Sequence, residues 1–241
     1  MYGDYLYIGN RTDGSSRCGL GDPRRQELGL DACPHPNPGI LVVDASDPSD
    51  PEVVNEVGQP YAGNPAETTR ELRVWPDKKL LMVLNFGCST VIHSCVGGNV
   101  TPTFRFFDLT DPANPEFVSE WIPRQANNAI RTPHEFFLWV DPQNSNRALL
   151  WTSTPTSSTN VNQANLMIAD ISTVPSGGTP QLVAQGNWTQ LFDPPRGNVR
   201  LHSMTPTPDG TETHLAYLSG FFLVSWTPPM SRCETTPPVR Y

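Results

Sequence analysis

The sequence predicts an all-β protein, a β-propeller built of four-stranded antiparallel blades. The main observation is a repeated segment, which reads as a hydrophobic strand, Asp, Ser/Thr-Asp-Pro, a two-residue tip, Pro-Glu and a second strand. It covers residues 43–54 and 107–118 and returns in degraded form at 167–183. Repetition of this kind indicates a repeat architecture. The 26 prolines and 18 glycines favour short strands joined by turns, and no window of roughly 11–18 residues has a helical stripe of apolar residues.

Strands are predicted where apolar residues alternate or run continuously, and turns where Asp-Pro, Asn-Pro or Gly-Gly occur. The first repeat opens with a segment that matches the second strand of the later repeats. Its predicted strands are 5–8, 39–44 and 52–57. The second repeat is complete, with predicted strands at 69–75, 80–86, 103–109 and 116–122.

The third repeat follows the same order, and the last one is again incomplete. The third has predicted strands at 134–140, 148–153, 165–171 and 181–187. The last has 202–207, 215–219 and 221–226, and its fourth strand is unclear. We therefore expect one propeller domain over residues 1–241, with approximate blades at 1–60, 61–125, 126–190 and 191–241.

About three and a half to four blades are predicted, with ragged ends. A propeller closes its ring by pairing strands from both termini in one blade, which leaves no exposed edge. The first predicted blade lacks its first strand, and the last lacks a clear fourth strand. We therefore expect the chain to be a segment of a larger ring of about six to eight blades. The alternative is a complete four-bladed ring with degenerate closure.

Three motifs carry a family resemblance: Tyr5-Leu-Tyr-Ile-Gly-Asn10, Gly39-Ile-Leu-Val-Val-Asp44 and Ser46-Asp-Pro-Ser-Asp-Pro51. They resemble the LVIVD-repeat β-propeller proteins, strongly in the first two repeats and poorly around 221–226. The resemblance implies a propeller that is often exported and has no assigned activity. The chain is more distantly similar to the selenium-binding protein and methanethiol oxidase propellers, which resemble a metal-dependent enzyme family, but it matches no motif specific to them.

The charge of the chain argues against nucleic acid as a partner. The formal net charge is -8 and the isoelectric point is near 5.0, which disfavours binding to nucleic acid or to an anionic membrane surface. No apolar run approaches the roughly 18–20 residues that span a bilayer. Residues 1–4 lack the basic and apolar regions of a signal peptide. We therefore expect a protein or small-molecule partner, and no membrane-spanning segment in this chain.

The cysteines favour an oxidising compartment. Cys18 and Cys33 bracket one polar insertion, and Cys88 and Cys95 bracket another. Disulfides at these pairs would each close a short surface loop, as is usual in exported proteins. Cys233 is left over. The predicted location is extracellular, periplasmic or at the cell surface, although five free thiols in a cytosolic protein are the alternative.

The Asp-Ser/Thr-Asp-Pro turns have two competing interpretations. Asp44 and Asp47, like Asp108 and Asp111, offer hard oxygen ligands for calcium. Each cluster has too few carboxylates for the six to eight oxygens, roughly, that calcium prefers. We therefore expect these side chains to accept hydrogen bonds from turn amides instead.

Alignment of the repeats places Arg70, His134 and His202 at one position, the start of the innermost strand. That strand lines the central channel of a propeller, so these residues are predicted to converge from neighbouring blades. Two imidazoles and a nearby carboxylate suit a transition metal. The carboxylate is Glu71 or Glu135, and both are weaker candidates than the histidines, because an error of one position turns a side chain to the other face of its strand.

Two other interpretations of this position stay open. In the first, an anion binds through Arg70 and Arg131, or through Arg200, which precedes His202 by two residues. Alternatively, all these polar side chains simply form hydrogen bonds around a wet channel. No cofactor is firmly implied, and no residue is assigned a catalytic role.

Together these observations favour an exported or cell-surface propeller that acts as a ligand- or protein-binding scaffold, rather than an enzyme. A purely structural or adhesive surface domain fits the same features. The other alternative is a metal-dependent enzyme, an oxidoreductase for example, with a channel site near His134 and His202. The large aromatic residues are assigned to the core, namely Trp75, Phe106, Phe107 and Trp139.

Overall fold

A computed structural model describes most of the 241-residue chain. The described residues are 1–9, 39–58, 67–87, 99–156, 158, 160, 162–189 and 200–218, together with the backbone of 220–225. Within them the regular structure consists of β-strands and two three-residue 3₁₀ helices. The chain divides into two compact units, Met1–Glu120 and Trp121–Tyr241, and each is described by itself.

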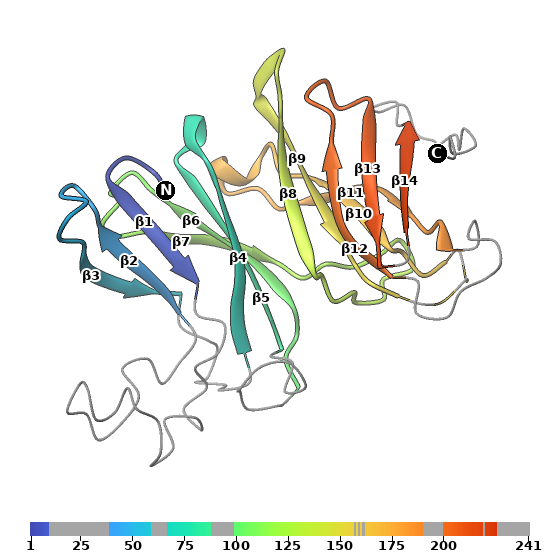
Figure 1. Ribbon diagram of the computed structural model, residues 1–241, viewed down its shortest axis with the longest axis horizontal. Helices are drawn as coiled ribbons and strands as arrows, with labels where there is room; N and C mark the ends of the chain where they lie inside the picture. The colour runs from blue at the N-terminus through green and yellow to red at the C-terminus, as the bar shows by residue number, and fades with distance from the viewer. Residues whose placement is uncertain are drawn as a thin grey trace. The chain divides into compact units, whose positions relative to one another are not determined.

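The first unit contains two sheets in which consecutive strands lie side by side, as in a propeller blade. One has the order β1-β2-β3 and the other the order β4-β5-β6-β7 (Figure 1). The strands of the first sheet are β1 (Tyr5–Gly9), β2 (Ile40–Asp44) and β3 (Glu52–Val57). Those of the second are β4 (Glu67–Trp75), β5 (Leu80–Gly87), β6 (Thr103–Asp108) and β7 (Glu116–Trp121).

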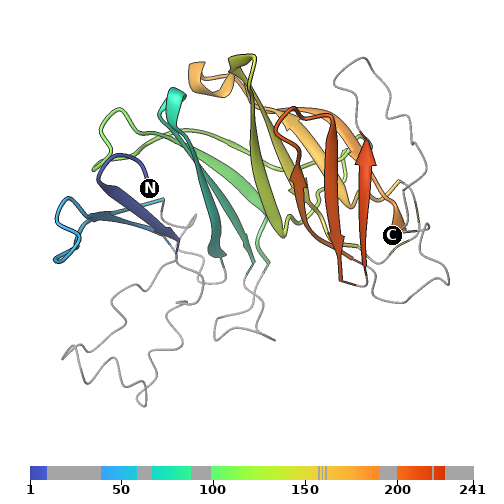
Figure 2. The ribbon, with the colours of Figure 1, turned by 45° about the horizontal axis from the view of Figure 1, so that its top comes forward.

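The second unit repeats this arrangement with one four-stranded and one three-stranded sheet. The four-stranded sheet has the order β11-β10-β9-β8, and the three-stranded sheet has the order β12-β13-β14 (Figure 2). The first contains β8 (Glu135–Asp141), β9 (Asn144–Ser153), β10 (Leu166–Asp170) and β11 (Gln181–Gly186). The second contains β12 (Leu201–Pro206), β13 (Glu212–Tyr217) and β14 (Gly220–Ser225).

Every predicted strand is present, and the first and last sheets have three described strands, as predicted. The largest differences lie at the starts of β9 and β13, where residues 144–147 and 212–214 extend the strands. These extensions are polar, so they lack the apolar pattern that marks a strand in the sequence. They pair through the backbone ladder, for example Asp141 with Asn144 and Thr213 with Val224.

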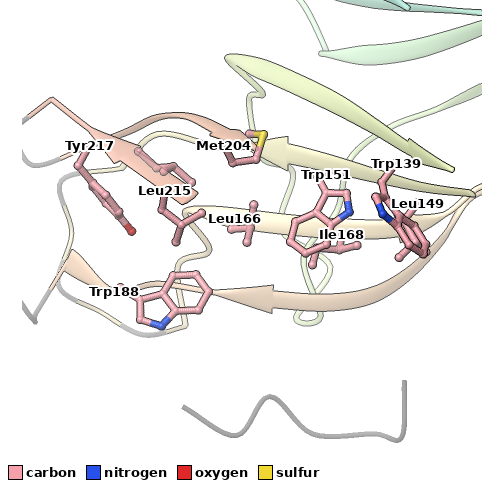
Figure 3. Close-up of a cluster of buried hydrophobic side chains, with 10 residues drawn as sticks. Trp139, Leu149, Trp151, Leu166, Ile168, Trp188, Met204, Leu215 and Tyr217 are labelled. Atoms are coloured by element: carbon pink, nitrogen blue, oxygen red, sulfur yellow. The ribbon is translucent and has the colours of Figure 1, made fainter. Parts of the chain in front are cut away.

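The core lies between the sheets of each unit and contains the aromatic residues assigned to it. Trp75, Phe106, Phe107 and Trp139 are all buried, which confirms the prediction. In the second unit one cluster joins both sheets, with Trp151 and Ile168 from the four-stranded sheet and Met204 and Leu215 from the three-stranded one (Figure 3). This shared core holds β12 beside β8 and β9.

The Asp residues of the repeated turns accept hydrogen bonds from turn amides, as predicted. The amide of Ser46 donates to Asp44 Oδ1 at 2.8 Å, and the amide of Thr110 donates to Asp108 Oδ1 at 2.6 Å. The hydrogen bond from Ser46 holds the pKa of Asp44 below its usual value. These carboxylates therefore stabilise the turns that follow β2 and β6.

The Asp-Pro turn of the second repeat also joins the two sheets of the first unit. The Tyr7 hydroxyl on β1 donates to the carbonyl of Pro112 at 2.9 Å, and Asn55 Nδ2 on β3 donates to the carbonyl of Ala113 at 3.1 Å. Burial is the main reason that the pKa of Tyr7 is raised to about 12, and the charges of the neighbouring Tyr2, Tyr5 and Asp111 contribute less. The phenol therefore keeps the proton that it donates.

Candidate functional site

Three of the four predicted site residues meet in the second unit. One ligand atom from each of His134, Glu135 and His202 lies within 4.8 Å of the others. Glu135 Oε1 is 3.5 Å from His202 Nδ1 and 3.9 Å from His134 Nδ1. The two imidazole rings lie 4.4 Å apart between centroids, at 59° to one another. Residues far apart in the sequence thus form one compact cluster, which we call the His-Glu-His cluster.

A β-bulge places His202 in this cluster. On β12, Leu201 pairs with Tyr217 and Ser203 pairs with the adjacent Ala216, so His202 is the extra residue between them. A bulge changes the direction of a side chain relative to simple alternation along the strand. The side chain of His202 is therefore directed by the bulge, which sequence alternation alone does not predict.

His134 and Glu135 are held at the other side of the cluster by the end of β9. The amide of His134 donates to the carbonyl of Ser153 at 2.8 Å, and the amide of Glu135 donates to Ser153 Oγ at 3.0 Å. These bonds fix two consecutive residues at the start of β8. Successive side chains within a strand point to opposite faces. His134 precedes the first regular pair of β8, so its side chain is not bound by this alternation and can reach His202 together with that of Glu135.

Ser153 also contacts the strand that carries His202, and sequence reasoning missed this residue. Its hydroxyl oxygen lies 2.9 Å from the carbonyl oxygen of His202. The signal that could have found it is a departure from the repeat. In the ladder, Glu71 pairs with Leu84, Ser203 with Ala216, and Glu135 with Ser153. A hydroxyl thus stands where the other repeats have an apolar side chain.

The chemistry of the His-Glu-His cluster matches that of a transition-metal site. Two imidazole nitrogens and one carboxylate oxygen are usual ligands of zinc and related ions. Bonds of about 2.0–2.2 Å place two ligands of a tetrahedral ion about 3.3 Å apart, close to the 3.5 Å between His202 and Glu135. The side chains are partly exposed, at 29% for His134 and Glu135 and 45% for His202, so an ion there would also face solvent.

The fourth predicted residue, Arg70, lies in the first unit. It too is the extra residue of a bulge, because Thr69 pairs with Asn85 and Glu71 with the adjacent Leu84. Its guanidinium lies 5.5 Å from the centre of the Phe86 ring. The repeat alignment of Arg70 with His202 is thus reproduced in the ladder. Its approach to the histidines stays a prediction.

The remaining polar residues that were proposed as metal or anion ligands form contacts with residues close to them. Glu71, the other candidate carboxylate, accepts a hydrogen bond from Arg73. Arg131 Nη2 donates to the carbonyl of Thr154 at 3.4 Å, and partial burial lowers the pKa of this guanidinium. Arg200 is exposed, and its carbonyl accepts a bond from the amide of Leu218. Anion binding by Arg131 or Arg200 stays a prediction.

The predicted disulfides lie outside the described residues, because none of Cys18, Cys33, Cys88 and Cys95 is among them. In the part of the chain that the structure describes, no helix has the length and apolar character to cross a membrane.

Comparison with known proteins supports the fold. No family model and no curated protein matches the chain. A solved structure of a Lactobacillus plantarum protein is similar with a TM-score of 0.52 at 10% identity, over 84% of this chain and 50% of that one. The chain thus spans about half the length of that protein. The likeness and the four meander sheets place the chain in the β-propeller fold class, as predicted. Membership of the LVIVD-repeat family and the number of blades in the ring stay predictions.

Two further solved structures align over nearly the whole chain with lower scores. The periplasmic gluconolactonase of Pseudomonas aeruginosa has a TM-score of 0.48 at 8% identity, over 99% of this chain and 67% of that one. A putative 6-phosphogluconolactonase from Bacteroides fragilis has a TM-score of 0.40 at 13% identity, over 99% of this chain and 80% of that one.

Proposed function

We propose that this chain is a propeller scaffold that binds a transition-metal ion through His134, Glu135 and His202. One observation carries the proposal: ligand atoms of these three side chains lie within 4.8 Å of one another. They come from the starts of β8 and β12, on separate sheets of one unit. Two imidazoles and one carboxylate are a donor set that suits a cation rather than an anion.

The donor set selects the class of metal. Calcium and magnesium prefer six or more oxygen ligands, roughly, whereas imidazole suits zinc, copper, iron and nickel. Three protein ligands leave at least one coordination position of such an ion for water or for a ligand atom. The partial exposure of all three side chains supports access to that position. The ligand of the scaffold is then a small molecule or a partner side chain that completes the coordination.

Titration of the chelator-stripped full chain with zinc tests this proposal. We expect about one equivalent to bind. Substitutions His134→Ala and His202→Ala each remove a direct ligand, so affinity should fall by more than the about 10–100-fold typical of losing a supporting residue. His214→Ala is the matched control, because His214 is exposed on β13 and lies outside the cluster. Equal zinc affinity in all four proteins would refute the proposal.

A second candidate function is catalysis at the same ion, and the exposure of the ligands favours it. An open coordination position is the mark of a catalytic rather than a structural metal site. Oxygen uptake with ascorbate by the protein loaded with less than one equivalent of copper tests redox turnover. A rate that is the same for His202→Ala as for wild type would exclude catalysis at this cluster.

Export and membership of the LVIVD-repeat family belong to the same proposal and are supported by the sequence motifs. The expected result is that protein made in an oxidising compartment contains two disulfides, Cys18–Cys33 and Cys88–Cys95. Intact mass with and without reductant, followed by peptide mapping under non-reducing conditions, measures this. Fully alkylatable cysteines in the unreduced protein would contradict the export proposal.

A further inference from the structure

We propose that Ser153 is a positioning residue of the His-Glu-His cluster, which fixes the main chain of Glu135 and His202 so that their side chains converge. This inference rests on the proposed metal-binding function. It assigns a role to a buried residue that is not itself a ligand.

The contacts of the Ser153 hydroxyl carry the inference. Ser153 is fully buried, and Ser153 Oγ accepts a hydrogen bond from the amide of Glu135 at 3.0 Å. It lies 2.9 Å from the carbonyl oxygen of His202 and 3.3 Å from that of Glu135. A hydroxyl donates only one hydrogen, and the His202 carbonyl is the nearer acceptor. The hydroxyl therefore accepts from Glu135 and donates to His202.

The bulge explains why His202 benefits from such a contact. A regular strand is positioned by its ladder, but a bulge disrupts the ladder locally and leaves the extra residue unpaired. His202 is that residue on β12. The hydrogen bond from Ser153 supplies a constraint from the neighbouring sheet at the residue where the pairing with β13 is irregular.

Ser153 also connects the two halves of the cluster. It is the last residue of β9, in the sheet that carries His134 and Glu135, whereas His202 lies on β12 of the other sheet. The separation between His202 Nδ1 and Glu135 Oε1 depends on how these sheets lie against each other at this point. One buried hydroxyl bonded to the main chain of both residues holds that separation, as groups surrounding a metal site commonly do.

Zinc titration of Ser153→Ala, measured on the full chain, tests the inference. We expect affinity to fall by about tenfold or more, because both main-chain partners lose their bond. Thr152→Val is the matched control, since it removes another fully buried hydroxyl from β9, one that makes no hydrogen bond within the described residues. Its zinc affinity should stay within about twofold of wild type.

A spectroscopic readout separates positioning from general stability. Cobalt in place of zinc gives visible absorption bands that depend on ligand geometry, and these should change in Ser153→Ala but not in Thr152→Val. Ser153→Thr retains the hydroxyl and should keep zinc affinity within about threefold of wild type. If Ser153→Ala does not fold, this variant decides, because a tenfold loss in it would overturn the inference.

The outcomes distinguish the two proposals. If wild type does not bind zinc or cobalt, the proposed function fails, and the positioning role fails with it. If wild type binds the metal and Ser153→Ala binds it with equal affinity and an unchanged cobalt spectrum, only the inference about Ser153 fails.

Discussion

Substitution Asn187→Asp is expected to lower the free energy of unfolding by about 2–5 kcal/mol. Asn187 is buried, and its Nδ2 lies 3.0, 3.1 and 2.7 Å from the carbonyl oxygens of Ser158, Asn160 and Gln163, among which its two hydrogens are shared. The substitution keeps the size of the side chain but turns a donor into an oxygen that faces three carbonyl oxygens. Urea unfolding followed by tryptophan fluorescence measures the effect.

The pH dependence of this variant follows from the same contacts. One oxygen of the new carboxyl is buried against three carbonyl oxygens, while the other keeps the hydrogen bonds from Asn165 Nδ2 and the amide of Thr189. Burial and the three facing carbonyls outweigh these two bonds, so the protonated form is favoured and the pKa is raised in the folded state. A raised pKa destabilises the folded state as pH rises through the ordinary value of about 4. The loss of stability should therefore be largest above the raised pKa, shrink as the pH falls from that pKa towards about 4, and be smallest below about 4.

The control for this prediction lies in the same loop. Asn160 is exposed, and its Oδ1 accepts from the amide of Asn162 at 3.0 Å. Asn160→Asp retains that acceptor, so the expected change is within about 0.5 kcal/mol. Equal shifts of the urea midpoint in both variants would show that the three carbonyls do not surround Asn187 Nδ2 as described.

Breaking the buried ion pair of the first unit should have the second large effect. Arg105 Nη2 on β6 lies 2.7 Å from Glu67 Oε1 on β4, with the side chains 3% and 5% exposed. Asn85 Nδ2 also donates to Glu67 Oε1, at 2.8 Å. Arg105→Met removes the Arg105 charge from a buried carboxylate, and such a change costs about 3–5 kcal/mol. Thermal unfolding monitored by circular dichroism, with denaturant titration for the free energy, measures it.

The same strand offers a matched exposed pair. Arg73 on β4 pairs with Glu71, and its side chain is 45% exposed. Arg73→Met should therefore cost at most about 1 kcal/mol. The double substitution Glu67→Met with Arg105→Met should recover much of the stability, because it removes both buried charges. A loss below 1 kcal/mol in Arg105→Met alone would contradict this account.

The fold was predictable because its signals are local. Strand patterns and Asp-Pro turns lie within a few residues of one another, so the repeat located each strand, and the polar extensions of β9 and β13 were the main errors. The repeat alignment also brought His134 and His202 to one position. The structure keeps the alignment of Arg70 with His202, because each of these residues is the extra residue of a β-bulge.

The remaining features depend on contacts between residues far apart in the sequence. The partner of Glu67 is Arg105, on a different strand, and no local pattern marks either as part of a buried pair. Asn187-Trp188-Thr189 has the form of a glycosylation site, yet the amide of Asn187 is buried and engaged by three carbonyls. Only the folded chain shows that this amide is inaccessible to a glycan.

The joint between β1, β3 and the second Asp-Pro turn has a consequence for how the repeat can change in evolution. Tyr7 and Asn55 bind the carbonyls of Pro112 and Ala113, and a carbonyl is the same in every residue type. The two tip residues accordingly differ between copies, Ser-Asp in one and Ala-Asn in the other, while the flanking prolines recur. Substitutions at Ala113 can accumulate without loosening the joint, whereas Asn114 also accepts a hydrogen bond from Asn55 Nδ2 through its side-chain oxygen, at 3.1 Å. Distant copies of this repeat should therefore be recognised by the Asp-Pro frame rather than by the first tip residue.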